Sequence, residues 1–132
     1  ESTGDFLVFA SNDVEFTPNS IIEAFMSQSG GFCAFNTGEV IPDEGNICEH
    51  FMIARFRVEQ IGEIFDTDFH HLGVDNLLWA KMKKLGVATR CKDAVVIHNH
   101  FTKGASMDDV YSLAYKHIIE DRNLLQTKLK EL

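Results

Sequence analysis

The sequence predicts an α/β fold with a mixed, mostly parallel sheet flanked by helices, and two patterns support this prediction. Residues Phe6–Phe9 are four consecutive apolar residues, which suit a strand buried on both faces of such a sheet. A chain of 132 residues is long enough for one compact domain. Further along, apolar residues recur at helical spacing and a glycine follows them: Val74, Leu77, Leu78, Met82 and Leu85, then Gly86.

The predicted first strand ends in a polar tip that carries Asp13 and Glu15. Ligands of parallel sheets bind beyond the carboxyl ends of the strands, so Asp13 is placed where a ligand would bind. The alternative is a strand followed by a turn in which the Asp13 side chain bonds to nearby backbone. The tip is therefore a candidate site that needs a second signal.

Turn residues and apolar periodicity predict the elements that follow the first strand. A helix should begin at Thr17–Pro18 and end at Gly30–Gly31. Short strands are expected at 32–35 and 47–56, separated by a loop rich in glycine and acids, and a helical turn should end at Gly62. The first helix should pack through an apolar stripe of Ile21, Ile22, Phe25 and Met26.

A long amphipathic helix is predicted from Ser106 to the end of the sequence. Its polar face is not strongly basic, unlike that of helices that lie on membrane surfaces, so its apolar face should pack on the body or on a partner. The chain thus divides into a main portion, residues 1–104, and a C-terminal helix within residues 105–132.

Asp75 supplies the second signal, because it lies at the predicted start of the helix that ends at Gly86. The partial positive charge of a helix N-terminus keeps a carboxylate ionised. Such a carboxylate suits a catalytic base, although a helix cap is the alternative role. An Asp- and His-rich loop, residues 65–72, precedes it.

Three segments together resemble the GT-A glycosyltransferases, and family 2 of that class in particular. The first is Ser11-Asn12-Asp13-Val14-Glu15-Phe16-Thr17-Pro18, which resembles the Asn-Asn-Asp variant of the Asp-x-Asp motif at a strand end. The second combines Phe65-Asp66, Phe69, Val74-Asp75 and Lys83-Lys84-Leu85-Gly86. The third is the apolar strand Ala94-Val-Val-Ile-His98. The resemblance runs from about Gly4 to Phe101.

The resemblance implies a metal-assisted transfer of a sugar, with inversion, from a nucleotide-sugar donor to an acceptor hydroxyl. It implies a Mn²⁺ or Mg²⁺ ion held by Asp13 and His98, with Asp75 as the catalytic base. The acceptor would be a glycan, a lipid-linked molecule or a protein. It also implies a donor diphosphate near Ser11 and Asn12, and an acceptor near His70, His71, Val74 and Trp79.

The sequence departs from the family pattern in three respects. Ser11 stands where the motif's first acid would be, and Val74 replaces the first acid of the usual pair. In that family a nucleotide-binding half precedes the metal strand, whereas this sequence starts at that strand. We therefore expect an acceptor-side portion of the domain that works with a separate N-terminal half or a second copy.

Composition limits the partners. The formal charge is -8 and the pI near 5.1, which argues against binding to a nucleic-acid backbone. No apolar run is long enough for a membrane span, and no signal peptide opens the chain, so a cytoplasmic location is predicted. Cys33, Cys48 and Cys91 follow no zinc spacing and are expected to be buried free thiols.

Without the resemblance, the same residues suit other interpretations. His98 could be a hydrogen-bonded strand residue, and Trp79 a core residue. One alternative function is a zinc-dependent hydrolase that uses His98, His100 and a carboxylate. Another is a non-catalytic glycan-binding or assembly module.

Overall fold

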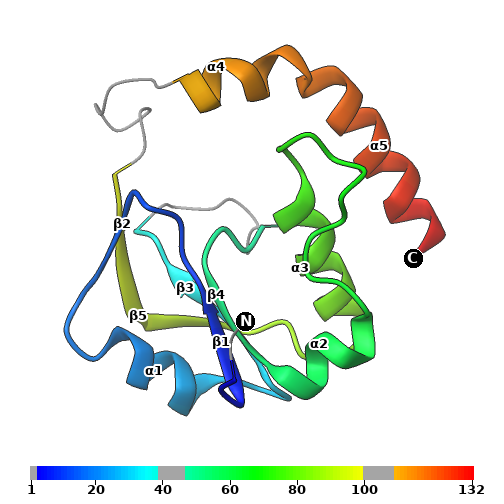
Figure 1. Ribbon diagram of the computed structural model, residues 1–132. Helices are drawn as coiled ribbons and strands as arrows, with labels where there is room; N and C mark the ends of the chain where they lie inside the picture. The colour runs from blue at the N-terminus through cyan, green and yellow to red at the C-terminus, as the bar shows by residue number, and fades with distance from the viewer. Residues whose placement is uncertain (1–2, 39–46, 100–108) are drawn as a thin grey trace.

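A mixed sheet of five strands forms the centre of the protein in the computed structural model, which describes residues 3–38, 47–99 and 109–132. The sheet has the order β1-β4-β3-β5-β2, and helices pack around it (Figure 1). The strands are β1 (Phe6–Phe9), β2 (Val14–Phe16), β3 (Phe32–Asn36), β4 (Phe51–Ala54) and β5 (Arg90–His98). The helices are α1 (Ser20–Ser27), α2 (Arg55–Ile61), α3 (Val74–Lys84), α4 (Asp109–Lys116) and α5 (Ile118–Glu131).

The α/β class is as predicted, but the prediction of a mostly parallel sheet is wrong. Strand β1 runs antiparallel to β4, β4 to β3, and β5 to β2, and the pair β3 and β5 is parallel. Strand β1 lies at a sheet edge, where Val8 is 40% and Phe9 37% exposed. An apolar run such as Phe6–Phe9 indicates a tendency to burial, but it carries no information about strand direction.

Side chains that alternate along β3 divide the core into two layers. Phe32 and Ala34 point to one face, where they pack with α3 residues such as Leu78. Cys33 and Phe35 point to the other face, where Ala24 of α1 covers them. Because strand side chains alternate with a period of two, one short strand supports both layers. The sheet is thus covered by α1 on one face and by α3 on the other.

Helix α1 packs through the opposite face from the one predicted. Its buried residues are Ser20 and Ala24, which are spaced i, i+4 and are small enough to bring the helix backbone close to the sheet. The predicted stripe instead faces outward, although the Phe25 ring contacts the Phe6 ring at a centroid distance of 5.2 Å. The exposed stripe residues are Ile21 (47%), Ile22 (61%), Phe25 (48%) and Met26 (74%).

The C-terminal segment forms two helices where one was predicted. Helix α4 ends at Lys116 and α5 begins at Ile118, and His117 between them has a non-helical φ of -107° and ψ of 9°. The two helices arch past α3 (Figure 1), and α5 contacts α3. Residues 106–108, where the single helix was expected to begin, lie outside the described residues.

The three cysteines are buried free thiols, as predicted. Burial raises the pKa of the Cys33 thiol to about 11, so this side chain is un-ionised at neutral pH. Among the described residues, no helix has both the length and the apolar composition needed to cross a bilayer.

Candidate functional site

A cavity of about 560 Å³ lies at the end of the sheet where β1 ends and β4 begins. Its volume is within the range of small-molecule sites. Antiparallel pairing of β1 with β4 explains this position, because the end of one strand meets the start of the other. The cavity is lined by Phe9, Ser11, Ile47, Glu49, His50, Phe65, Asp66, Thr67, Phe69, His70, His71, Leu72, Val74, Asp75 and His98.

The two predicted metal ligands, Asp13 and His98, are in contact. The register of β2 on β5 pairs Val14 with His98, so the residue before β2 lies beside the end of β5. The N–H of Asn99 donates to the carbonyl of Asp13 at 2.8 Å and fixes this end of the pair. As a result, Asp13 Oδ2 lies 3.2 Å from His98 Nε2, although 85 positions separate the two residues.

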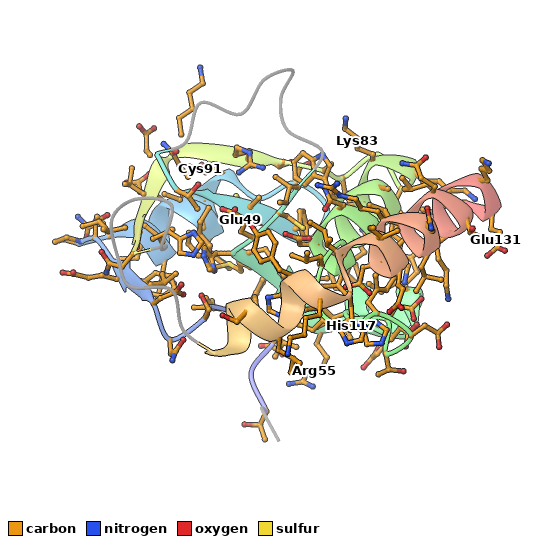
Figure 2. All side chains as sticks on the ribbon, turned by 90° about the horizontal axis from the view of Figure 1, so that it is seen from above. Glu49, Arg55, Lys83, Cys91, His117 and Glu131 are labelled. Atoms are coloured by element: carbon orange, nitrogen blue, oxygen red, sulfur yellow. The ribbon has the colours of Figure 1, made fainter. Side chains whose placement is uncertain are left out.

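Glu49 and His50 complete this cluster, and neither was predicted from the sequence. Glu49 Oε2 lies 3.7 Å from His98 Nδ1, and the His50 ring is perpendicular to the His98 ring at 4.8 Å between centroids. They immediately precede β4, whereas the pattern that predicts ligand sites applies to residues that follow strands. The usable signal was a Glu-His pair directly before the apolar run Phe51–Ala54. Figure 2 shows Glu49 near the centre of the molecule, whereas Lys83 and Glu131 lie at its periphery.

Three side chains at this cluster could hold a divalent ion. One donor atom each from Glu49, His50 and His98 lie within 4.8 Å of one another, and the two histidines are only 3% and 8% exposed. Two imidazoles and a carboxylate suit zinc and related transition ions. Mg²⁺ prefers ligands that are all oxygen, whereas these residues offer two imidazole nitrogens and one carboxylate oxygen.

Asp75 lies in the first turn of α3 and lines the cavity. It is not the N-cap, which is Gly73 at φ 96°. The Asp75 carboxylate accepts the N–H of Asn76 at 2.9 Å, and the Asp75 carbonyl accepts the thiol of Cys48 at 3.2 Å. Burial raises the pKa of Asp75, and the hydrogen bond from Asn76 opposes this rise in part. A raised pKa makes the ionised carboxylate a stronger base.

The remaining predicted residues divide between the cavity and the core. Ser11, His70, His71 and Val74 line the cavity, and the hydroxyl of Ser11 donates to Asp13 Oδ1. Asn12 is exposed and is not among the lining residues. Trp79 is 4% exposed and packs in the core beside Phe32, away from the lining. His100 lies outside the described residues.

Asp121 of α5 holds the loop before Asp75 and was not predicted. Its carboxylate, 1% exposed, accepts three successive backbone N–H groups, those of His70 (2.9 Å), His71 (3.0 Å) and Leu72 (2.8 Å). Burial tends to raise the pKa of Asp121, but these N–H donors outweigh burial and the pKa is lowered. Lys128, also on α5, pairs with Asp66 at 2.7 Å. The C-terminal helix therefore fixes one wall of the cavity.

The chain matches no family model, no curated protein sequence and no solved structure. The functional inference therefore depends on the sequence motifs and on the geometry of the cavity.

Proposed function

We propose that this chain is the acceptor-side portion of a metal-assisted, inverting glycosyltransferase with Asp75 as the catalytic base. One observation carries the proposal: Asp75, Ser11 and His98 come from three distant parts of the sequence and line the same cavity. Asp13, at the strand tip that resembles the family motif, contacts His98. Each of the three segments that resemble the family motifs thus contributes a residue to this cavity.

In the proposed reaction, the acceptor hydroxyl attacks the anomeric carbon of the donor sugar while Asp75 takes the hydroxyl proton. A new carbon–oxygen bond forms as the bond to the diphosphate breaks, and the diphosphate leaves with that electron pair. Attack opposite the leaving group inverts the configuration. The raised pKa of Asp75 favours proton transfer to it. A divalent ion bound near His98 would stabilise the negative charge of the leaving diphosphate.

The donor is proposed to be held by a second polypeptide segment, either an N-terminal nucleotide-binding half or another copy of the chain. Among the described residues, β1 pairs with β4 alone. The other edge of β1 therefore has backbone groups available for a further strand. A strand added there would run alongside β1, whose end leads to Ser11 in the cavity lining.

The test uses the longest natural polypeptide that contains this chain, supplied with Mn²⁺ and a panel of nucleotide sugars. Release of the nucleoside diphosphate, with transfer of the sugar to an acceptor, is the expected result. Asp75→Asn should lower turnover by about 100-fold or more, because an amide cannot accept the proton. Glu63→Gln, an exposed acid that does not line the cavity, is the matched control. Unchanged turnover in Asp75→Asn would refute the assignment.

A second candidate function is a zinc-dependent hydrolase, which the ligand set Glu49, His50 and His98 favours. Two histidines and a glutamate, with a bound water, are a known catalytic zinc arrangement. The set expected from the sequence used His98, His100 and a carboxylate, and His100 lies outside the described residues. Stoichiometric zinc, hydrolysis of a simple ester and no affinity for nucleotide sugars would together select this candidate over the first.

A further inference from the structure

His98 lies between two carboxylates, and its two ring nitrogens face different ones. Nε2 is 3.2 Å from Asp13 Oδ2, and Nδ1 is 3.7 Å from Glu49 Oε2. In a neutral imidazole one nitrogen carries the proton, and only the other has a lone pair for an ion. A single ion at His98 therefore lies either on the Asp13 side or on the Glu49 side.

We propose that the ion binds His98 at Nδ1, with Glu49 and His50 as the other protein ligands. Asp13 is then a positioning residue that accepts the Nε2 proton. This inference deepens the metal assistance in the proposed function, and its test does not need catalytic activity.

The first argument comes from the two distances. The contact between Nε2 and Asp13 has the length of a hydrogen bond, whereas 3.7 Å between Nδ1 and Glu49 is too long for one. Two ligands that share an ion, each at about 2.0 to 2.2 Å, are separated by about 3.3 to 3.6 Å in tetrahedral geometry. The Glu49 side is therefore too wide for a direct hydrogen bond but close to the spacing of two ligands of one ion, whereas the Asp13 side already has the length of a hydrogen bond.

The second argument comes from the contacts that the two oxygens of the Asp13 carboxylate make. Its Oδ1 accepts the hydroxyl of Ser11, and its Oδ2 faces His98. Metal-bound histidines commonly donate their second ring N–H to a carboxylate, which fixes the tautomer and the ring orientation. Asp13 has this relationship to His98. Ser11 stands where the family motif has its first acid. Its hydroxyl then orients Asp13 through the hydrogen bond to Oδ1.

The third argument is access to the cavity. Glu49, His50 and His98 line the cavity together with Asp75, whereas Asp13 is not among the lining residues. An ion on the Nδ1 side would therefore lie on the cavity side of His98, where a ligand can reach it. The two imidazoles further favour zinc and related transition ions such as copper, iron or nickel over magnesium.

The decisive measurement is the protonation state of His98 in the Zn²⁺-loaded protein. Long-range ¹H–¹⁵N NMR of protein with ¹⁵N-labelled histidine distinguishes a protonated from a metal-bound ring nitrogen, and His98→Gln assigns the signals. We expect Nε2 to be protonated and Nδ1 to be metal-bound. The reverse assignment would overturn the inference and place the ion beside Asp13. The protonation state is read from the unaltered protein, and only the assignment of the signals uses the variant.

Zn²⁺ and Mg²⁺ affinities, measured by chelator competition, give an independent test. We expect one Zn²⁺ per chain, much weaker Mg²⁺ binding, and the largest loss of affinity in Glu49→Gln. Asp13→Asn should lose about 10- to 100-fold, as removal of an outer hydrogen-bond partner does. Glu15→Gln, an exposed acid two positions from Asp13, should bind normally. Thermal melting checks that each variant is folded.

The outcomes separate this inference from the proposed function. If Asp13→Asn abolishes binding and Glu49→Gln has no effect, the metal assignment is wrong and the glycosyltransferase proposal stands. If Asp75→Asn keeps full transfer activity while zinc binding follows the pattern above, the proposed base is wrong and the metal site stands. If the unaltered protein binds no divalent ion, the metal site and the metal assistance both fail.

Discussion

The carboxylate of Asp121 accepts the backbone N–H of His70 at 2.9 Å, a contact between residues 51 positions apart. The same carboxylate holds the two following N–H groups of the loop, so a residue of the last helix sets the backbone of the segment that leads to Asp75. The position of the proposed base thus depends on α5 as well as on α3.

Replacement of Asp121 by Asn should destabilise the protein by about 2 to 3 kcal/mol, because a buried, charged acceptor of several hydrogen bonds is lost. Urea unfolding measures this change. Glu131→Gln is the control, since Glu131 is an exposed acid on the same helix and surface substitutions change stability by about 0.5 kcal/mol or less. Equal unfolding midpoints for Asp121→Asn and the unaltered protein would show that the contact contributes nothing.

Stability should fall when the pH drops below about 4. The pKa values of Asp121 and Asp66 are lowered in the folded protein, Asp66 chiefly by its hydrogen bond from Lys128. Lowered values mean that the ionised forms stabilise the folded state above the unfolded pKa, and that this stabilisation is lost as the pH falls through the folded pKa. Thermal melting between pH 7 and pH 2 measures the profile. Asp121→Asn should show a shallower decline, and an identical decline would contradict the assignment.

Replacement of Asp75 by Asn should change stability in the opposite direction to Asp121→Asn. Burial raises the pKa of Asp75, so the folded state favours the protonated form, and that contribution to stability is present below the unfolded pKa and lost as the pH rises through the folded pKa. At pH 7 the ionised carboxylate is a cost, which an amide of the same size removes. The melting temperature of the variant should equal or exceed that of the unaltered protein at pH 7, and the advantage should vanish near pH 3. Earlier melting at pH 7 would mean that the carboxylate stabilises α3.

Gly31→Ala should cost more than Gly62→Ala, although both glycines have a positive φ, 86° and 82°. An added Cβ at Gly31 would lie 2.9 Å from the Cβ of Ala54, whereas at Gly62 it would meet nothing within 4 Å. The backbone penalty of about 1 to 2 kcal/mol applies to both positions. Crowding should add about 1 to 3 kcal/mol at Gly31. Paired urea titrations measure the difference, and equal losses would show that Ala54 yields without cost.

The register of β2 on β5 brings Asp13 and His98, which lie 85 positions apart, into contact. Their roles toward a metal stay a prediction. Glu49 and His50 could not be assigned to the same cluster from sequence, because their position depends on the pairing of β4 with β1 and β3. Asp121 could not be singled out from the sequence for a similar reason: its partners are backbone groups of a distant loop.

What the sequence by itself determined is local. Apolar spacing and Gly86 located α3 to within one residue at its C-terminal end, and the apolar residues from Phe32 onward located β3. Only the tertiary structure decided strand direction, the edge position of β1 and the face through which α1 packs. Periodicity and turn residues act over one or two turns of chain, whereas these choices depend on hydrogen bonds and close packing between residues far apart in sequence. Ser20 and Ala24 show this most clearly. They form the buried face of α1 because they are small enough for the helix to lie close to the sheet.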